Sequence, residues 1–348
     1  MIKIGKKCVG QDFPPFIIAE MSGNHNQSLD KALELVQAAA DSGAHALKLQ
    51  TYTPDSMTLP IKSGEFYIDD PKSLWFGSSL YDLYGVASTP LEWHKPIMDL
   101  AIKNNLEVFS TPFDVEAVDF LESLGVPCFK IASFEATHIP LLKKVAETGK
   151  PVIVSTGMCT MSEISETVDT LRKNGLKEII LLKCTSSYPA QPSSCNLNTI
   201  PHMRHTFQCE VGLSDHTLGL GVPLASIALG STVIEKHFTI KRSDGGVDSA
   251  FSLEPGELQN LVFESERAWQ SLGKVRYGPT ESEEESIRYR RSIYVSKDIC
   301  EGDPLTSDNI RIVRPGFGLS PKYFDIILGK KVNCDLKAGE AMKWSYFG

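Results

Sequence analysis

The chain has 348 residues, of which 42% are hydrophobic and 22% are charged, and its formal net charge is −8 at pH 7. This length suits one large domain followed by a small one, and the acidic balance argues against a nucleic-acid partner, which would need a basic face to neutralise phosphates. Because the apolar runs are shorter than the roughly 20 residues that span a bilayer and no signal peptide is visible, we expect a cytoplasmic protein without a membrane partner.

Eight short apolar stretches recur along the first part of the chain, and nearly every one ends in a charged or hydroxyl residue. They cover residues 16–21, 45–52, 106–113, 128–135, 151–158, 178–188, 210–217 and 232–239. In the intervening segments, such as 28–42 and 161–174, apolar residues recur at helical spacing. Short buried strands that alternate with helices predict a parallel sheet, and eight such units predict an α/β fold of the (β/α)8 TIM-barrel class.

The carboxyl ends of the strands build the active site of a (β/α)8 barrel. The sequence places many polar side chains there, namely Glu20, Lys48, Gln50, Thr111, Lys130, Ser133, Glu135, Ser155, Ser214, His216, Glu235 and His237. One polar strand end can simply meet solvent, but so many converging on one face indicate an enzyme.

Two histidines stand out in this set. His216 and His237 end the seventh and eighth predicted strands, which are neighbours in a closed barrel. Two converging imidazoles can bind a divalent transition metal and leave positions open for water or substrate. Taken singly, either could instead be a hydrogen-bonding core residue or a general base. His25 is a weaker candidate, and His94 is predicted to be structural.

Cations and hydroxyls form a second set, which predicts a pocket for a phosphate or a carboxylate. Its members are Lys48, Lys130, Ser133, Ser155 and Ser214. Lys130 lies between two apolar strand residues and therefore needs a partner, either a carboxylate such as Glu135 or an anionic ligand. A Schiff-base lysine is the alternative, which keeps a class I aldolase open. Glu20 and Glu135 could act as general acid or base, or could simply pair with a lysine.

The pattern of apolar and turn residues changes after the eighth predicted helix. Turn signals followed by a short acidic run mark a boundary, which divides the chain into a barrel domain (1–277), a linker (278–288) and a small domain (289–348). Short apolar patches separated by turns predict that the small domain is mostly β. A domain of this size is marginally stable alone, so we expect it to pack against another protein surface. Eight cysteines without a Cys-x-x-Cys pair favour free thiols.

Seven motifs of the predicted barrel resemble the sialic acid synthase family, and they occur in family order. They are IAEMSGNH (18–25), ALKLQ (46–50), STPF (110–113), KIAS (130–133), STGM (155–158), GLSDHT (212–217) and EKHFT (235–239). The small domain resembles the SAF domain, which is similar to type III antifreeze protein. The resemblance therefore covers nearly the whole chain.

This resemblance implies the condensation of phosphoenolpyruvate with an N-acetylated amino sugar in its open aldehyde form, which gives a nine-carbon 2-keto acid and phosphate. It implies that His216 and His237 bind a divalent ion, Mn2+ in preference to Mg2+ or Co2+. The implied catalytic residues are Glu20, Glu135, Lys48 and Lys130, with the acid and base roles of the glutamates left undivided. The implied substrate-binding residues are Gln50, Thr111, Ser133, Ser155, Ser186, Tyr188, Ser214 and Asp248.

The tail carries one further implied site residue. Arg314 matches the SAF-domain arginine that reaches the sugar in a neighbouring subunit, so the resemblance implies a domain-swapped homodimer. The segment 278–285 is long enough to carry the tail away from its own barrel.

The loop after the second predicted strand favours one sugar. Residues 74–84 (LWFGSSLYDLY) and 89–95 (TPLEWHK) resemble the branch of the family that makes pseudaminic acid from 2,4-diacetamido-2,4,6-trideoxy-L-altrose. Ser186 replaces the Asn that is usual in N-acetylneuraminate synthases, in agreement with this branch. Synthesis of N-acetylneuraminate or legionaminate is the alternative. A Schiff-base aldolase and a non-catalytic ice- or carbohydrate-binding protein are more distant ones.

Overall fold

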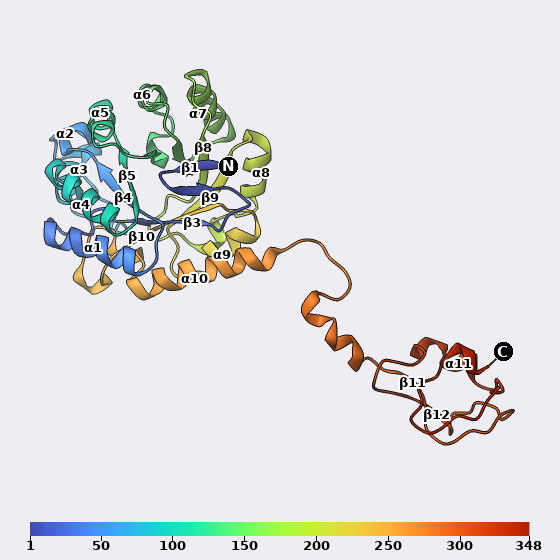
Figure 1. Ribbon diagram of the computed structural model, residues 1–348. Helices are drawn as coiled ribbons and strands as arrows, with labels where there is room; N and C mark the ends of the chain where they lie inside the picture. Colours follow the sequence, from blue (N-terminus) through green and yellow to red (C-terminus); the bar gives the residue numbers. More distant parts are fainter. Residues whose placement is uncertain (348) are drawn as a thin grey trace. The chain divides into compact units, whose positions relative to one another are not determined.

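The first part of the chain forms a closed barrel of eight parallel strands, which confirms the predicted TIM barrel (Figure 1). The computed structural model describes residues 1–347, and these divide into two compact units between Gly273 and Lys274. The barrel strands are β3 (Phe16–Glu20), β4 (Ala46–Thr51), β5 (Glu107–Pro112), β6 (Phe129–Ile131), β7 (Val152–Ser155), β8 (Ile179–Cys184), β9 (Glu210–Asp215) and β10 (Val233–His237). The last strand, β10, pairs with the first, β3, and closes the ring.

Eight helices surround the barrel (Figure 1), each in the connection that follows a strand. They are α1 (Leu29–Asp41), α4 (Leu91–Lys103), α5 (Val115–Ser123), α6 (Ile139–Glu147), α7 (Met161–Lys173), α8 (Thr199–Phe207), α9 (Gly221–Ala228) and α10 (Pro255–Leu272). Their starts follow local sequence rules. For example, the Thr160 hydroxyl accepts the Glu163 amide while the Glu163 carboxylate accepts the Thr160 amide, which completes a capping box at α7.

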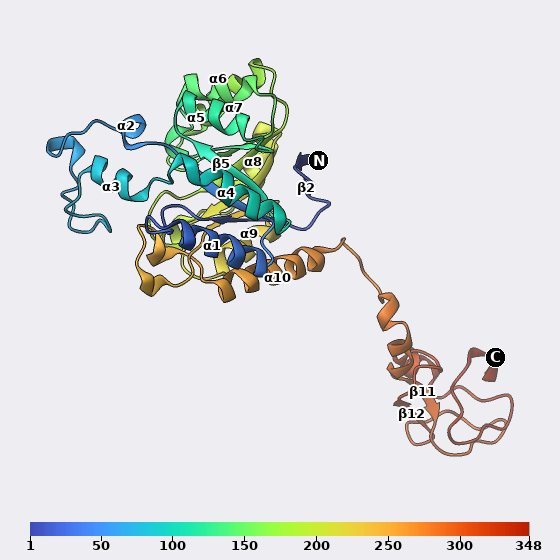
Figure 2. The same ribbon diagram turned by 60° about the vertical axis from the view of Figure 1, so that its left-hand side comes forward.

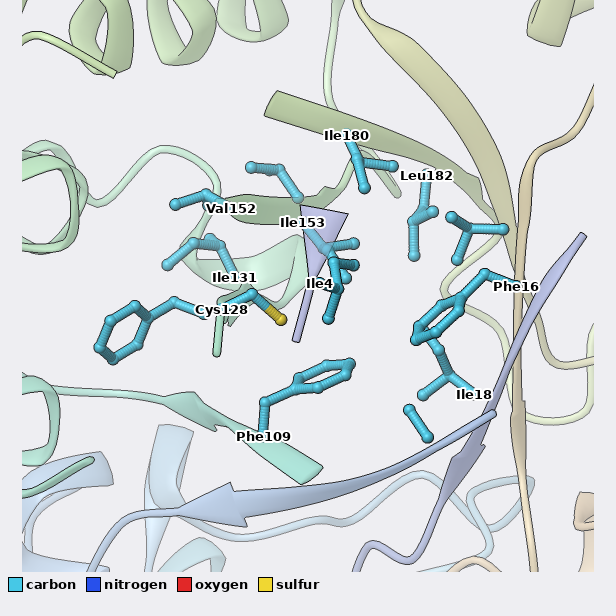
Figure 3. Close-up of a cluster of buried hydrophobic side chains, with 14 of the residues drawn as sticks. Ile4, Phe16, Ile18, Phe109, Cys128, Ile131, Val152, Ile153, Ile180 and Leu182 are labelled. Atoms are coloured by element: carbon cyan, nitrogen blue, oxygen red, sulfur yellow. The ribbon is translucent and has the colours of Figure 1, made fainter. Parts of the chain in front are cut away.

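Side chains two residues apart on a strand share a face, and this alternation divides the barrel interior into layers. The layer nearer the strand starts is apolar, and Figure 3 shows Phe16, Ile18, Phe109, Ile153, Ile180 and Leu182 within one cluster. The next inward-facing position along each strand carries a polar side chain, as in Ile18 followed by Glu20 on β3. The packed lower layer therefore supports a polar upper layer at the carboxyl end.

Gly212 on β9 lies in a crowded part of the barrel wall. A Cβ atom at this position would meet the Val233 carbonyl oxygen at 2.4 Å and Cδ2 of Leu182 at 2.8 Å. Neither the backbone carbonyl nor the packed leucine can yield that much space, so only glycine lets β8, β9 and β10 approach this closely.

A short hairpin precedes the barrel and was not anticipated from the sequence. Strands β1 (Ile2–Ile4) and β2 (Lys7–Val9) pair antiparallel, with Ile2 opposite Val9. Ile4 is fully buried and lies among the lower-layer side chains (Figure 3). The hairpin therefore caps the apolar end of the barrel, the end opposite the polar layer.

The longest connection of the barrel lies between β4 and α4. It contains two short helices, α2 (Pro54–Met57) and α3 (Leu80–Ala87), which stand away from the barrel helices in Figure 2. Because this loop follows a strand's carboxyl end, it belongs to the polar end of the barrel.

The second unit has a small core of its own. Strands β11 (Ser292–Val295) and β12 (Ile310–Val313) pair antiparallel, and short 3-10 turns at Glu281–Glu283 and Glu285–Tyr289 precede them. The core comprises Ile293, Val295, Ile299, Leu305, Ile310, Ile327, Val332, Leu336, Met342 and Phe347. Across residues 1–347, no helix combines the length and apolarity that a membrane span requires.

Candidate active site

The polar upper layer holds two lysines and two carboxylates in direct contact. Lys48 of β4 forms a close ion pair with Glu20 of β3, donates to the Thr111 hydroxyl at 3.1 Å, and lies 3.9 Å from a Glu235 carboxylate oxygen. Burial alone would lower the pKa of Lys48, but the carboxylates of Glu20 and Glu235 outweigh it and raise that pKa. Lys48 therefore stays a cation within a dry pocket.

Lys130 of β6 supplies the second cation. Its Nζ donates to the Ser155 hydroxyl at 2.8 Å and to the Ile131 carbonyl at 3.2 Å, and it lies 3.5 Å from Oε1 of Glu235. The sequence suggested Glu135 or an anionic ligand as the partner of Lys130, and the carboxylate it meets is Glu235. Burial and the nearby Lys48 charge lower the pKa of Lys130, against the opposing pull of Glu235.

Glu235 of β10 links the two cations and was named from the sequence only as a strand end, without a role. It accepts from the Ser214 hydroxyl at 3.0 Å, while its other oxygen, Oε2, has no hydrogen-bond partner among the described residues. Burial would raise its pKa, but Lys130 and Lys48 lower it below the usual value. Glu235 is thus a fixed anion that offsets part of the positive charge of the pocket.

Glu20 differs from Glu235 although both are buried. Its Oε1 accepts from the Gln50 amide at 3.2 Å and from the Ser22 backbone amide at 3.1 Å. Burial, together with the nearby Glu235 carboxylate, raises the pKa of Glu20 to about 7 against the pull of Lys48. A carboxyl group with this pKa can give or take a proton near neutral pH.

Glu135 ends the short 3-10 turn Ser133–Glu135 that follows β6. Burial raises its pKa to about 7 as well, and its Oε2 has no hydrogen-bond partner among residues 1–347. An unpartnered buried carboxyl oxygen at a barrel mouth is suited to bind a ligand. The pocket therefore carries two carboxyl groups that titrate in the neutral range.

Two hydroxyl-bearing residues that follow barrel strands, Ser133 and Ser186, lie close to one glycine. The Ser133 hydroxyl accepts the Gly157 amide at 3.0 Å, and a Cβ on Gly157 would lie 2.8 Å from the Ser133 oxygen and 2.2 Å from the Ser186 oxygen. The absence of a side chain at Gly157 therefore lets both hydroxyls face the pocket beside Lys130 and Ser155. Ser186 belongs to this hydroxyl group.

The two histidines predicted as metal ligands lie close together. Their ring centroids are 5.3 Å apart. Nδ1 of His216 lies 3.0 Å from the Thr185 carbonyl, which can only accept, so Nδ1 donates there and a neutral ring would present the lone pair of Nε2. Burial would lower the pKa of His216, but Cys184 and the Thr185 carbonyl outweigh burial and raise it. Nδ1 of His237 has no hydrogen-bond partner in the described chain and is 3.5 Å from an Asp248 oxygen. Burial and the nearby charge of His216 hold the pKa of His237 well below its usual value, which favours the neutral, ligating form.

A thiol at the end of β8 was missed as a site group. Cys184 Sγ is 3.9 Å from Nδ1 of His216 and 3.8 Å from the Ser186 hydroxyl. Burial would raise its pKa, but His216, Ser133 and Lys130 outweigh burial and lower it to about 7. The sequence showed a buried free thiol here, and only the neighbours set its acidity. All eight cysteines are free, as expected.

Aromatic rings line the histidine side of the pocket. The Tyr188 ring is 4.5 Å from the His216 ring, and the Phe251 ring is 4.9 Å from the His237 ring. The Trp75 ring lies 5.9 Å from Tyr188, on the side of the loop after β4. Asp248, a predicted sugar-side residue, accepts a short hydrogen bond from the Ser22 hydroxyl. The pocket thus has a charged pole around the lysines and an aromatic pole around the imidazoles.

Two of the histidines named from the sequence bond to threonines rather than to the pocket groups described above, and Arg314 belongs to the other unit. His94 is buried in α4 and its Nε2 lies 2.8 Å from the Thr51 hydroxyl, while Nε2 of His25 lies 3.1 Å from the Thr89 hydroxyl. Arg314 belongs to the second unit, follows β12 directly and is exposed. Residues 1–347 contain no group of three or more His, Cys, Asp and Glu side chains suited to a metal.

Comparison with known proteins identifies the family. The NeuB family model matches residues 35–277, and the SAF domain model matches residues 290–347. The chain is 42% identical to pseudaminic acid synthase of Helicobacter pylori over 93% of this chain and 95% of that protein. It is 37% identical to N,N'-diacetyllegionaminic acid synthase of Legionella pneumophila, over 98% of this chain and 97% of that one.

A solved structure agrees with this assignment. The N-acetylneuraminic acid synthetase of Leptospira borgpetersenii, crystallised with citrate, superposes with a TM-score of 0.73 at 35% identity. The match covers 82% of this chain and 94% of that chain. The chain therefore belongs to the NeuB family of carbon–carbon bond-forming synthases, with a SAF domain after the barrel.

Proposed function

We propose that this protein condenses phosphoenolpyruvate with 2,4-diacetamido-2,4,6-trideoxy-L-altrose to give pseudaminic acid and phosphate. The observation that carries the proposal is the division of one barrel mouth into a pole with two buried lysines and a pole with two imidazoles and aromatic rings. A small substrate with two anionic groups and an electrophilic sugar aldehyde need these two environments side by side.

The lysine pole suits phosphoenolpyruvate. Charge-assisted hydrogen bonds from ammonium groups to carboxylate or phosphate oxygens are about twice as strong as neutral ones, and a buried setting strengthens them further. The pole offers two ammonium groups and a set of hydroxyls from five strand ends, namely Lys48, Lys130, Thr111, Ser133, Ser155, Ser186 and Ser214. Glu235 keeps both cations oriented in the absence of the ligand.

The reaction forms one carbon–carbon bond and breaks one carbon–oxygen bond. C3 of phosphoenolpyruvate attacks the aldehyde carbon, whose oxygen takes up a proton, and positive charge develops at C2. A water adds at C2 and gives up a proton. The C2–O bond to phosphate then breaks, and the remaining C2 hydroxyl loses its proton to become the keto oxygen. The lysines hold the phosphate and carboxylate through this sequence, and the anions of the pocket stabilise the positive centre at C2.

The two neutral-range glutamates provide the proton transfers. The pKa of both Glu20 and Glu135 is raised to about 7. At that pKa a carboxyl group can protonate the aldehyde oxygen in one step and accept the proton of the attacking water in another. Glu20 is held by Gln50 and Ser22, whereas Glu135 keeps a free oxygen.

The imidazole pair fits a divalent ion. Within residues 1–347, neither Nε2 of His216 nor Nδ1 of His237 makes a hydrogen bond, and both rings are held at the pocket wall by neighbours. Two nitrogen donors with open positions suit Mn2+ or a similar ion, with Mg2+ and Co2+ as alternatives. Such an ion would act as a Lewis acid toward the aldehyde oxygen.

Metal removal tests this assignment. We expect chelator-treated protein to lose phosphate release and to regain it with Mn2+, and we expect His237→Ala to fail to bind Mn2+ in a titration followed by paramagnetic resonance. His94→Gln, which alters a histidine outside the pocket, is the matched control and should bind Mn2+ normally. Full turnover in metal-free protein would contradict the metal assignment.

The choice of sugar is tested by phosphate release with two substrates. The loop after β4, the presence of Ser186 and the 42% identity to a pseudaminic acid synthase support the diacetamido sugar. We expect a higher kcat/KM for this sugar than for N-acetylmannosamine. A preference for N-acetylmannosamine would overturn the sugar assignment and leave the synthase intact, whereas a lysine trapped by borohydride with its carbonyl substrate would favour an aldolase.

We further propose that Arg314 acts on the sugar held by a second copy of the chain. Exposed apolar side chains surround the mouth of the barrel, namely Phe134, Met158, Met161 and Leu218, and such a rim favours a protein cover. The barrel unit carries more acidic than basic residues, whereas the second unit carries more basic than acidic ones, so their net charges are opposite in sign, as electrostatic complementarity requires.

Mixed dimers test the proposal for Arg314. Neither Arg314→Ala nor His216→Ala is expected to be active alone. When the two chains are co-expressed and heterodimers are purified with two different tags, one of the two sites contains only intact parts, so we expect up to half of the wild-type activity. Heterodimers as inactive as their parents would exclude action across the dimer.

A further inference from the structure

One hydrogen bond joins the outer part of the loop after β4, residues 58–79, to a different loop of the barrel. The Trp75 indole Nε1 donates to the Val247 carbonyl at 2.9 Å, across 172 residues of sequence. The other hydrogen bonds of residues 58–79 stay within the loop between β4 and α4, such as that from Tyr67 to the Gly77 carbonyl. Trp75 is therefore the side chain of this segment that ties it by a hydrogen bond to the loop containing Val247.

The same side chain extends the aromatic pole away from the imidazoles. The Trp75 ring packs at 5.9 Å against Tyr188, whose other neighbour is the His216 ring at 4.5 Å. Trp75 thus stands one ring further from the reacting aldehyde carbon than Tyr188. With the aldehyde placed at the imidazoles, as proposed above, this row of rings is the surface available to the far end of the sugar.

The chemistry of the Trp75 ring at this place is purely apolar. An indole has one hydrogen-bond donor and no acceptor, and Val247 occupies that donor. A hydroxyl group pressed against the ring would lose its water and find no partner, whereas a methyl group would lose nothing. Apolar burial against an aromatic face therefore favours a sugar whose far end carries methyl groups.

We infer that Trp75 determines sugar selectivity: its ring forms the wall against which the 6-deoxy end and the second acetamido methyl of the substrate pack. This inference rests on the proposed function. The bond to Val247 is the positioning element, because it holds the ring in one orientation beside Tyr188 and consumes the only polar group that could otherwise bind a hydroxymethyl.

The test compares Trp75→Ala and Trp75→Phe with wild type in phosphate release, with both sugars and with phosphoenolpyruvate as the second varied substrate. For Trp75→Ala we expect the kcat/KM for the diacetamido sugar to fall about 10- to 100-fold, in the range that loss of small apolar contacts produces. The kcat/KM for N-acetylmannosamine should change much less, and the KM for phosphoenolpyruvate should stay unchanged. Trp75→Phe keeps a ring without the donor and should lie between these values.

Phe76→Ala is the matched control, because Phe76 adjoins Trp75 but is 56% exposed. It should leave the ratio of the two kcat/KM values intact, which excludes a general disturbance of the loop. An unaltered ratio in Trp75→Ala, or an equal fall for both sugars, overturns the inference. Failure of wild-type protein to release phosphate with any amino sugar would instead refute the proposed function. A wild-type preference for N-acetylmannosamine would refute both the assignment of the diacetamido sugar and the role of Trp75 in selecting it.

Discussion

Two buried lysines, one on the outer and one on the inner face of the barrel wall, differ in how completely the hydrogen-bonding groups around them are paired. Lys236 on β10 points outward and lies 2.9 Å from Asp215, whose oxygens also accept from the amide and hydroxyl of Thr217. Lys130 points inward, and Glu235, which it shares with Lys48, keeps one oxygen without a hydrogen bond in the described chain. Both lysines are nearly inaccessible to solvent.

This difference separates structural from functional charge. A buried ion pair whose hydrogen-bonding capacity is filled has nothing left for a ligand and acts as part of the scaffold. The inner group retains spare capacity, since Glu235, Glu135 and His237 each have an unpartnered buried atom. A buried polar atom without a hydrogen-bond partner destabilises the folded protein, and a bound substrate or ion that pairs with the atom removes this destabilisation.

The strongest way to break this comparison is to make the same substitution on both faces. We expect Lys130→Met to reduce kcat/KM for phosphate release by about 100- to 1,000-fold, because a fixed cation that holds the transferring group is lost. The denaturation midpoint should move less than in Lys236→Met, because Lys48 still neutralises Glu235. Retained activity in folded Lys130→Met would refute the role of the inner group.

Lys236→Met should show the opposite pattern. Loss of one partner leaves the Asp215 charge buried, so we expect about 3–5 kcal/mol of destabilisation, measured by chemical denaturation. Replacing both partners, in Asp215→Leu/Lys236→Met, should recover much of this loss because no unpaired charge remains. If the double variant is no more stable than the single one, the outer pair is not a self-contained structural unit.

Measuring stability as a function of pH extends the comparison to Glu135, a carboxyl group of the inner face. The pKa of Glu135 is raised to about 7, so the folded state binds its proton more tightly than the unfolded state does. Its contribution to stability is therefore complete below pH 4.5 and is lost as the pH rises through about 7. We expect the free energy of unfolding of Glu135→Gln, relative to wild type, to increase between pH 5 and pH 8. A constant difference would contradict the raised pKa.

The smallest expected effect concerns the hydroxyl group around Gly157. In Gly157→Ala the new methyl would stand 2.2 Å from the Ser186 oxygen and 2.8 Å from the Ser133 oxygen, and both hydroxyls can rotate away. The protein should fold normally, with a KM for phosphoenolpyruvate raised about tenfold, in line with about 1.4 kcal/mol for a displaced hydrogen-bonding set. Gly256→Ala, at an α10 position where an added methyl meets no atom within 4 Å, controls for the added methyl in stability measurements. An unchanged KM in Gly157→Ala would remove Gly157 from the site.

The sequence was sufficient to predict the barrel and the inward-facing residues of the mouth. Strand ends of a parallel barrel must meet, so the positions of Lys48 and Lys130 followed from local pattern alone. The carboxylate partner of Lys130 could not be predicted in this way, because Glu235 reaches Lys130 across the barrel and no local sequence spacing encodes that contact. For the same reason, the sequence did not predict the hydrogen bond from Trp75 to Val247 or the burial of Ile4 at the apolar end of the barrel.

The pairing of the first barrel strand with the last has a consequence for the growing polypeptide on the ribosome. Asn24 donates to the Phe238 carbonyl and the Ser252 hydroxyl, contacts that span 214 and 228 residues of sequence. Such distant partners are the slowest to meet, and domains complete their folding only once the whole segment has been synthesised. We therefore expect nascent chains stalled before β10 to be cut readily by proteases, and protection to appear only after this strand has left the exit tunnel.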